Sequence, residues 1–105
     1  MTTFEKREQA FEAKFIHDEE LRFKATARCN KMLGDWAAAQ LGLTGDAAAS
    51  YARGLVAADV EGHGLGDTLR KVAADLAQQG VSEHEVAERM DGFLHAALAQ
   101  IEAGS

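Results

Sequence analysis

The chain has 105 residues, a net charge of -6 and a hydrophobic content of 47%, which fits one folded domain and is too apolar for a wholly disordered protein. It contains no proline, so little apart from its glycines opposes helix formation. Its longest apolar runs are far shorter than the roughly 20 residues that cross a bilayer, and its charged beginning lacks the apolar core of a signal peptide. We therefore predict an all-α, cytoplasmic protein without direct membrane insertion.

The charges are unevenly distributed. Residues 1–31 hold seven basic and six acidic side chains, whereas residues 32–105 hold four basic and eleven acidic ones. Binding to a nucleic-acid backbone needs clustered Lys and Arg, so the acidic body argues against nucleic acid as a partner. The lone cysteine, Cys29, lacks a disulfide partner and a suitably spaced histidine pair for zinc. We interpret it as a small helix residue.

The first predicted helix is the longest and runs from about Phe4 to Leu41, ending at Gly42. Thr2 and Glu5 have the spacing of a capping box at its start. Eleven of the twenty residues from 5 to 24 are charged, and opposite charges four residues apart stabilise an isolated helix. Two such pairs are Asp18 with Arg22 and Glu20 with Lys24. This segment can therefore be helical without a core.

An aromatic stripe marks the beginning of this helix. At about 100° per residue, Phe4, Phe11 and Phe15 fall within about 40° of one another. A second apolar stripe starts roughly 120° away. It consists of Leu21, Ala25, Met32 and Trp36. We interpret the change of phase as an arm, residues 1–20, that addresses a partner and a body, residues 21–105, while Ile16 and Phe23 lie off both stripes. The pattern also fits the alternative that the three rings cap the end of the bundle.

Three further helices follow. The second is predicted from about Asp46 to Val60, with Thr44 as its N-cap, and the third begins at an Asp67 cap after a glycine-rich connection. Gly80 ends the third helix. Their predicted inward residues are Ala48, Tyr51, Ala52, Leu55 and Val56 in the second helix, and Leu69, Val72, Ala73 and Leu76 in the third.

The last helix has the clearest start. Ser82 and Glu85 form a capping box, and Val81 and Val86 have the spacing of a hydrophobic staple. Its predicted inward residues continue to the end of the chain as Met90, Phe93, Leu94, Ala97, Leu98 and Ile101. Four helices with short connections predict a small four-helix bundle with a long, partly mobile N-terminal helix.

The residues from Ala10 to Ala25 resemble the signature of the ATPase inhibitor zeta-subunit family of alphaproteobacterial F-type ATP synthases. The matching residues are Ala10, Phe11, Glu12, Ala13, Lys14, Phe15, His17, Asp18, Glu19, Glu20, Leu21, Arg22, Phe23, Lys24 and Ala25. The resemblance continues through Asn30, Gly34 and Trp36 to Gly45, and resumes at Asp59 and from Asp67 to Leu76. The sequence departs from the family pattern at Cys29, at Val60 and in the loop 62–66, all outside the arm.

Proteins of that family are four-helix bundles that bind the catalytic head of the ATP synthase. The resemblance therefore implies a regulatory inhibitor of ATP hydrolysis, not an enzyme, with the alpha, beta and gamma subunits as partners and no cofactor. It implies that the arm inserts as a helix at a catalytic alpha/beta interface near the gamma rotor, with the protein peripheral at the inner face of the plasma membrane when bound. The residues assigned to inhibition and partner binding are Phe4, Arg7, Phe11, Lys14, Phe15, His17, Asp18, Glu19, Leu21 and Arg22.

The residues offer few signs of other chemistry. Gly62, Gly64 and Gly66 could present backbone N–H groups to a phosphate, but no strand precedes them and no Lys-Ser/Thr pair follows. The four histidines have no metal-ligand spacing, and no Ser or Cys nucleophile has a visible base. The acids from Glu83 to Asp91 fit a solvated helix face. The alternative function is a non-enzymatic interaction or weak nucleotide-binding bundle that acts through its body.

Overall fold

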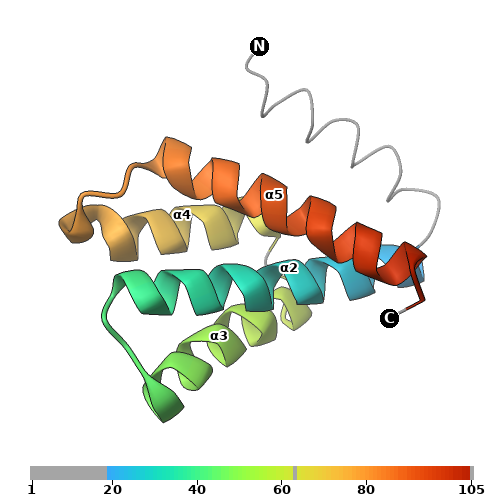
Figure 1. Cartoon of the computed structure of the whole chain (residues 1–105), viewed down its shortest axis with the longest axis horizontal. Coiled ribbons are helices and arrows are strands. Elements are labelled where there is room, and N and C mark those ends of the chain that lie inside the picture. Colours follow the sequence, from blue (N-terminus) through green and yellow to red (C-terminus); the bar gives the residue numbers. More distant parts are fainter. Residues whose placement is uncertain (1–18, 63, 105) are drawn as a thin grey trace.

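The computed structural model describes residues 19–62 and 64–104, and of residues 59 and 60 it describes the backbone alone. This part of the chain is an all-α bundle, as predicted. Its elements are α2 (Glu19–Gln40), α3 (Gly45–Val60), α4 (Leu65–Leu76), the 3₁₀ turn η1 (Ala77–Gln79) and α5 (Glu83–Glu102). Consecutive α-helices run antiparallel (Figure 1). The first part of the predicted N-terminal helix, with its capping box at Thr2 and Glu5, lies outside the described residues.

The turn between α4 and α5 is set by local signals. Gly80 has a left-handed backbone, with φ of 79°, and its N–H donates to the carbonyl of Ala77 at 3.2 Å, a conformation that favours glycine. The hydroxyl of Ser82 accepts a hydrogen bond from the N–H of Glu85 at 3.1 Å. Val81 and Val86 are both buried in the core. The predicted end at Gly80, cap at Ser82 and staple are therefore confirmed.

The predicted start of α4 at Asp67 is wrong. The N-cap is three residues earlier, at Gly64, which has an extended backbone, and the helix begins at Leu65. Asp67 lies inside the first turn and its carboxylate pairs with Arg70. An acidic side chain is favourable in the first turn because the N–H groups there are unpaired and partly positive. Because an acidic side chain is also favourable at the N-cap, Asp67 fits either the N-cap or the first turn. The glycine-rich residues before Asp67 did not prevent the helix from starting at Leu65.

Helix α2 lies at the centre of the bundle and makes its most extensive contacts with α3 and α5. The four residues at its core recur every fourth position. They are Ala25, Cys29, Leu33 and Ala37, all fully buried. Of the predicted stripe, Ala25 belongs to this core, whereas Leu21, Met32 and Trp36 are only partly buried against it and form one edge of the buried surface. The predicted inward residues of α5 all belong to the core or pack against it.

This arrangement changes the interpretation of the two stripes. The central buried residue Cys29 follows Phe15 by fourteen positions, which is an offset of only about 40° on an ideal helix. The earlier offset of roughly 120° came from Leu21, at the edge of the buried surface. The phase of the apolar residues therefore gives no reason to assign the arm and the body to different surfaces.

Candidate partner-binding surface

The residues assigned to partner binding divide at the start of α2. Those from Phe4 to Asp18, namely Phe4, Arg7, Phe11, Lys14, Phe15, His17 and Asp18, lie outside the described residues. The other three lie in the first turn of α2. Glu19 and Arg22 are exposed, whereas Leu21 is half-buried and packs against the core. Leu21 thus attaches the start of α2 to the body, and the two charged residues remain available at the surface.

The exposed side of this first turn is charged. Glu20 and Lys24 form an ion pair at 3.0 Å, which confirms one of the two predicted pairs, while the other involves Asp18. Both side chains are exposed, so the pair contributes little to stability. Phe23, between them, is 58% exposed and is the exposed large apolar residue within the described chain. Sequence reasoning left Phe23 out of both apolar stripes.

Polar and cation–π contacts attach α2 to α5, in addition to the shared core. Arg28 donates a hydrogen bond to the side-chain oxygen of Gln100 at 3.3 Å. The buried thiol of Cys29 lies 3.6 Å from the carbonyl oxygen of Met90. The guanidinium of Arg89 lies over the Trp36 ring, 5.4 Å from its centre, a distance suited to a cation–π interaction. Together they fix the middle of α2, from Arg28 to Trp36, against α5.

The contact between α2 and α3 is built differently. A Cβ atom placed on Gly34 would lie 2.6 Å from the Cα of Ala52 and 2.9 Å from its Cβ, so only glycine allows the two backbones to approach this closely. One turn earlier, Asn30 is fully buried, and neither its Nδ2 nor its Oδ1 has a hydrogen-bond partner among the described residues. A buried amide without partners loses its hydrogen bonds to water and gains none, which destabilises the fold.

A polar cluster attaches α3 to α4. The hydroxyl of Tyr51 donates to Asp75 at 2.7 Å, and the ammonium of Lys71 donates to the same carboxylate oxygen at 2.9 Å. Burial, then the hydrogen bond to Asp75 and its negative charge, raise the pKa of Tyr51. Burial alone would raise the pKa of Asp75, but the hydrogen bonds from Lys71 and Tyr51 and the charge of Lys71 lower it. The cluster therefore holds Tyr51 neutral and Asp75 ionised.

The acidic residues of α5 are not all solvated. Glu83, Glu85 and Glu88 are exposed, as predicted, but Asp91 is only 3% exposed. Its position explains the difference, because it lies between the core residues Met90 and Leu94 of the face that packs on the bundle. One oxygen of Asp91 lies 3.9 Å from Nδ1 of His95.

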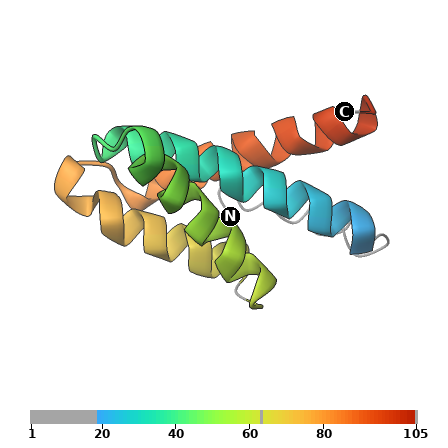
Figure 2. The ribbon, with the colours of Figure 1, turned by 90° about the horizontal axis from the view of Figure 1, so that it is seen from below.

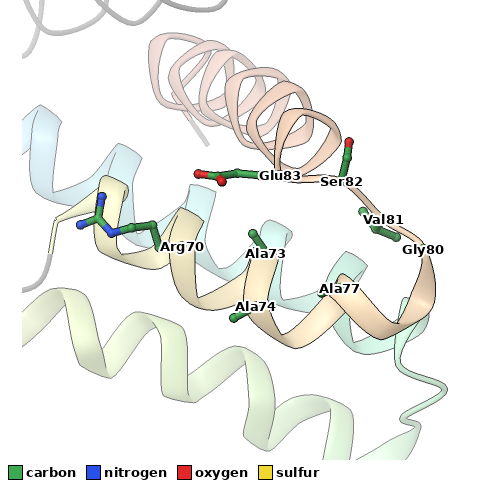
Figure 3. Close-up of a pocket in the computed structure, with 8 residues that line it drawn as sticks. All are labelled: Arg70, Ala73, Ala74, Ala77, Gly80, Val81, Ser82 and Glu83. Carbon is green, nitrogen blue, oxygen red and sulfur yellow. The ribbon is translucent and has the colours of Figure 1, made fainter.

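The body surface has an open hollow between α4 and α5. It has a volume of about 610 Å³ and is lined by Arg70, Ala73, Ala74, Ala77, Gly80, Val81, Ser82 and Glu83. Figure 3 shows the three alanines along α4 and the turn after it, with Arg70 farther back on α4 and Glu83 at the start of α5. Arg70 is already paired with Asp67, so the hollow presents small apolar side chains rather than a set of converging charges. It does not favour the nucleotide-binding alternative.

The part of the chain that the structure describes lacks two further features. No group of three or more His, Cys, Asp or Glu side chains there could hold a metal ion. None of the described helices combines the length and apolar character needed to cross a membrane.

Comparison with protein families identifies a match over most of the chain. Residues 1–100 match the sequence model of a family described as ATPase inhibitor subunit zeta. The match includes the residues before Glu19 as well as the four helices, so it covers both the predicted arm and the body. No curated protein sequence matches the chain.

Proposed function

The chain belongs to the ATPase inhibitor subunit zeta family, which matches it over residues 1–100, and from this premise we propose that it inhibits ATP hydrolysis by the catalytic head of an F-type ATP synthase. The family match is the observation that carries the proposal. In this function the protein is a regulator without catalysis of its own. It acts in the cytoplasm and is peripheral at the inner face of the plasma membrane when it is bound to the synthase.

The inhibitory element in this proposal is the arm, residues 1–20. It inserts as a helix at a catalytic interface between the alpha and beta subunits, near the gamma rotor, and stops rotation in the hydrolytic direction. Phe4, Phe11 and Phe15 supply aromatic anchors, while Arg7, Lys14, His17 and Asp18 supply polar contacts. Aromatic residues are common anchors in protein interfaces because they bury a large area with few rotatable bonds.

The body supports the arm by holding the start of α2 in place. Leu21 and Ala25 pack into the core on one side of this helix, and Glu19 and Arg22 remain exposed on the other. A helix that is anchored in this way cannot rotate freely about its axis, so the chain enters the partner with a defined direction. Pre-ordering of this kind lowers the entropy cost of binding.

A titration of ATP hydrolysis tests the proposal. The alphaproteobacterial catalytic head is mixed with the full chain, or with a version that lacks residues 1–20, after circular dichroism has shown that both are helical. We expect the full chain alone to inhibit. A full-length variant with Phe11→Ala and Phe15→Ala should inhibit more weakly by at least about tenfold, because two anchors are lost. Gln78→Ala, an exposed change in η1, is the matched control.

The outcomes separate the arm from the body. Equal inhibition with and without residues 1–20 would assign the function to the body and contradict the arm. Absence of inhibition by the folded full chain would reject inhibition as the function and favour a body that binds another ligand.

A further inference from the structure

Phe23 differs from the other large apolar side chains that the structure describes. Trp36, Tyr51 and Phe93 are partly buried and pack against the core, whereas Phe23 is 58% exposed. Single exposed apolar residues are common on protein surfaces, so exposure alone does not mark a site. The position of Phe23 on α2 carries more information.

Phe23 lies on the edge of α2 that faces α3. It precedes Asn30 by seven residues and Gly34 by eleven. On an ideal helix each interval is within about 20° of a whole number of turns, so the three residues lie along the same edge. At Gly34 this edge contacts Ala52 of α3, and at Asn30 it is still fully buried. Towards the start of α2 the two helices diverge, as Figure 2 shows. The edge is therefore covered at Gly34 and Asn30 and open at Phe23.

The surroundings of Phe23 have the composition of an interface. Glu19, Glu20, Arg22 and Lys24 are all exposed around it, so an aromatic ring lies inside a rim of charged groups. Protein interfaces commonly consist of an apolar centre and a polar rim. On the inward side, Ala25 belongs to the core and Leu21 packs against it, which holds the backbone of Phe23 in one orientation.

The exposed area decides what can bind here. A Phe side chain buries about 150–200 Å², whereas a stable interface needs about 800 Å² from each partner. Phe23 and its charged rim are therefore too small to hold a second copy of this chain without other contacts. They are sufficient to extend a larger interface that begins next to them, and the residues assigned to partner binding end at Arg22, directly before Phe23.

We propose that Phe23 is an anchor for the same partner as the arm, the catalytic head of the ATP synthase, so that the interface continues from the arm onto the open edge of α2. This inference rests on the proposed function. It adds a contact made by the folded body, on a helix whose position is fixed before binding. The expected partner surface is an apolar pocket bordered by charged groups, because it must accept one ring and face the rim.

The test uses the full chain with Phe23→Ala. Its half-inhibitory concentration should rise at least about tenfold, while its thermal unfolding stays unchanged because the ring is largely exposed. Phe23→Leu should give an intermediate increase, since it keeps part of the apolar area. Gln40→Ala, an exposed change at the opposite end of α2, should inhibit like the wild-type chain.

Equal inhibition by the wild-type chain and Phe23→Ala would overturn the anchor and leave the proposed function intact. A tenfold increase for Gln40→Ala as well would also overturn it, because the effect would then not depend on this edge. Failure of the folded wild-type chain both to inhibit and to bind the catalytic head would overturn the proposed function, and the anchor with it.

Discussion

The two sides of α2 are packed by opposite means. Towards α5 the helix is held by side chains that fill space and form polar contacts, with Cys29 against Met90 and Trp36 under Arg89. Towards α3 the packing depends on the lack of a side chain at Gly34, which lets the backbones of α2 and α3 approach closely at Ala52. The interface with α5 should therefore be sensitive to the removal of side-chain atoms, and the interface with α3 to their addition.

The largest expected effect is on the α5 side. Met90→Ala removes a side chain that is 4% exposed and leaves a cavity, so we expect the free energy of unfolding to fall by about 3 kcal/mol. Chemical denaturation monitored by circular dichroism measures this loss. The exposed neighbour Arg89→Lys should cost less, because it keeps the charge over Trp36. A loss below about 1 kcal/mol for Met90→Ala would show that this interface collapses around the cavity.

On the α3 side, addition of one methyl group should be destabilising. Gly34→Ala places a Cβ 2.6 Å from the Cα of Ala52, and this backbone atom cannot move aside as a flexible side chain would. We expect a loss of about 2 kcal/mol, although alanine favours helix over glycine by roughly 1 kcal/mol. Chemical denaturation measures this loss: if the wild-type chain and the variant have the same m-value, the shift in the denaturant midpoint gives the difference in the free energy of unfolding.

Gly54→Ala is the control for that substitution. Gly54 lies within α3, and a Cβ there would meet nothing within 4 Å. It should therefore stabilise the protein by up to about 1 kcal/mol through helix propensity alone. If both substitutions stabilise equally, the close approach of α2 and α3 is not a constraint.

The polar cluster between α3 and α4 should have a smaller effect that depends on pH. Tyr51→Phe removes one hydrogen bond to a charged group, with an expected loss of about 1–2 kcal/mol at neutral pH. The raised pKa of Tyr51 means that its contribution is present below about pH 10, the ordinary value for tyrosine, and is lost as the pH rises beyond it. The lowered pKa of Asp75 means that its contribution is present above about pH 4 and is lost in more acidic solution.

Tyr51 is the sole tyrosine of the chain, so ultraviolet absorbance follows its ionisation directly. We expect ionisation above the range of free tyrosine, and a shift back towards that range in Asp75→Asn. An ordinary titration in the wild-type chain would contradict the hydrogen bond. Lys31→Ala, which breaks a separate ion pair with Asp35, is a control that should leave the tyrosine titration unchanged.

The smallest expected change is at Asn30. Truncation of a buried, hydrogen-bonded side chain usually lowers the free energy of unfolding by about 1–3 kcal/mol, because its former partners are left unsatisfied. The amide of Asn30 has no hydrogen-bond partner in the part of the chain that the structure describes, and alanine is the better helix former. Asn30→Ala should therefore change the free energy of unfolding by less than about 1 kcal/mol. A loss of more than about 2 kcal/mol would indicate hydrogen bonds that form around this amide in solution.

The features of the fold that could be predicted from sequence are those with local causes. Ser82 and Glu85 are three residues apart, and Gly80 needs only its own backbone conformation, so both were recognisable without tertiary structure. Asp67 misled the prediction because acids are favoured at the N-cap and also in the first turn. The sequence alone could not choose between these two places.

The packing of α2 was harder to predict for a physical reason. A helix between two others is buried over a wide arc, and small residues such as Ala25, Cys29 and Ala37 carry much of that burial. Apolar periodicity gives weight to large side chains, so the predicted stripe contained Leu21, Met32 and Trp36 from the edge and only Ala25 from the buried centre. The close approach at Gly34 depends on the crossing of two helices distant in sequence, which no local pattern encodes.

The candidate site was predicted mainly through the family resemblance. Its arm residues precede Glu19, and their assignment depends on the proposed function. Phe23 could have been found from the sequence as a large apolar residue on a charged helix, off the face that contains Leu21 and Ala25. Its open position beside the end of α3 required the structure.

The burial of Cys29 provides a way to time the opening of the body. It is the single cysteine of the chain and has no exposed surface, so a thiol-reactive reagent can reach it only when α2 and α5 separate. When opening and closing are fast compared with the reaction, the labelling rate reports the free energy of opening. Measured with and without the catalytic head, this rate would show whether binding at the start of α2 tightens or loosens the centre of the same helix.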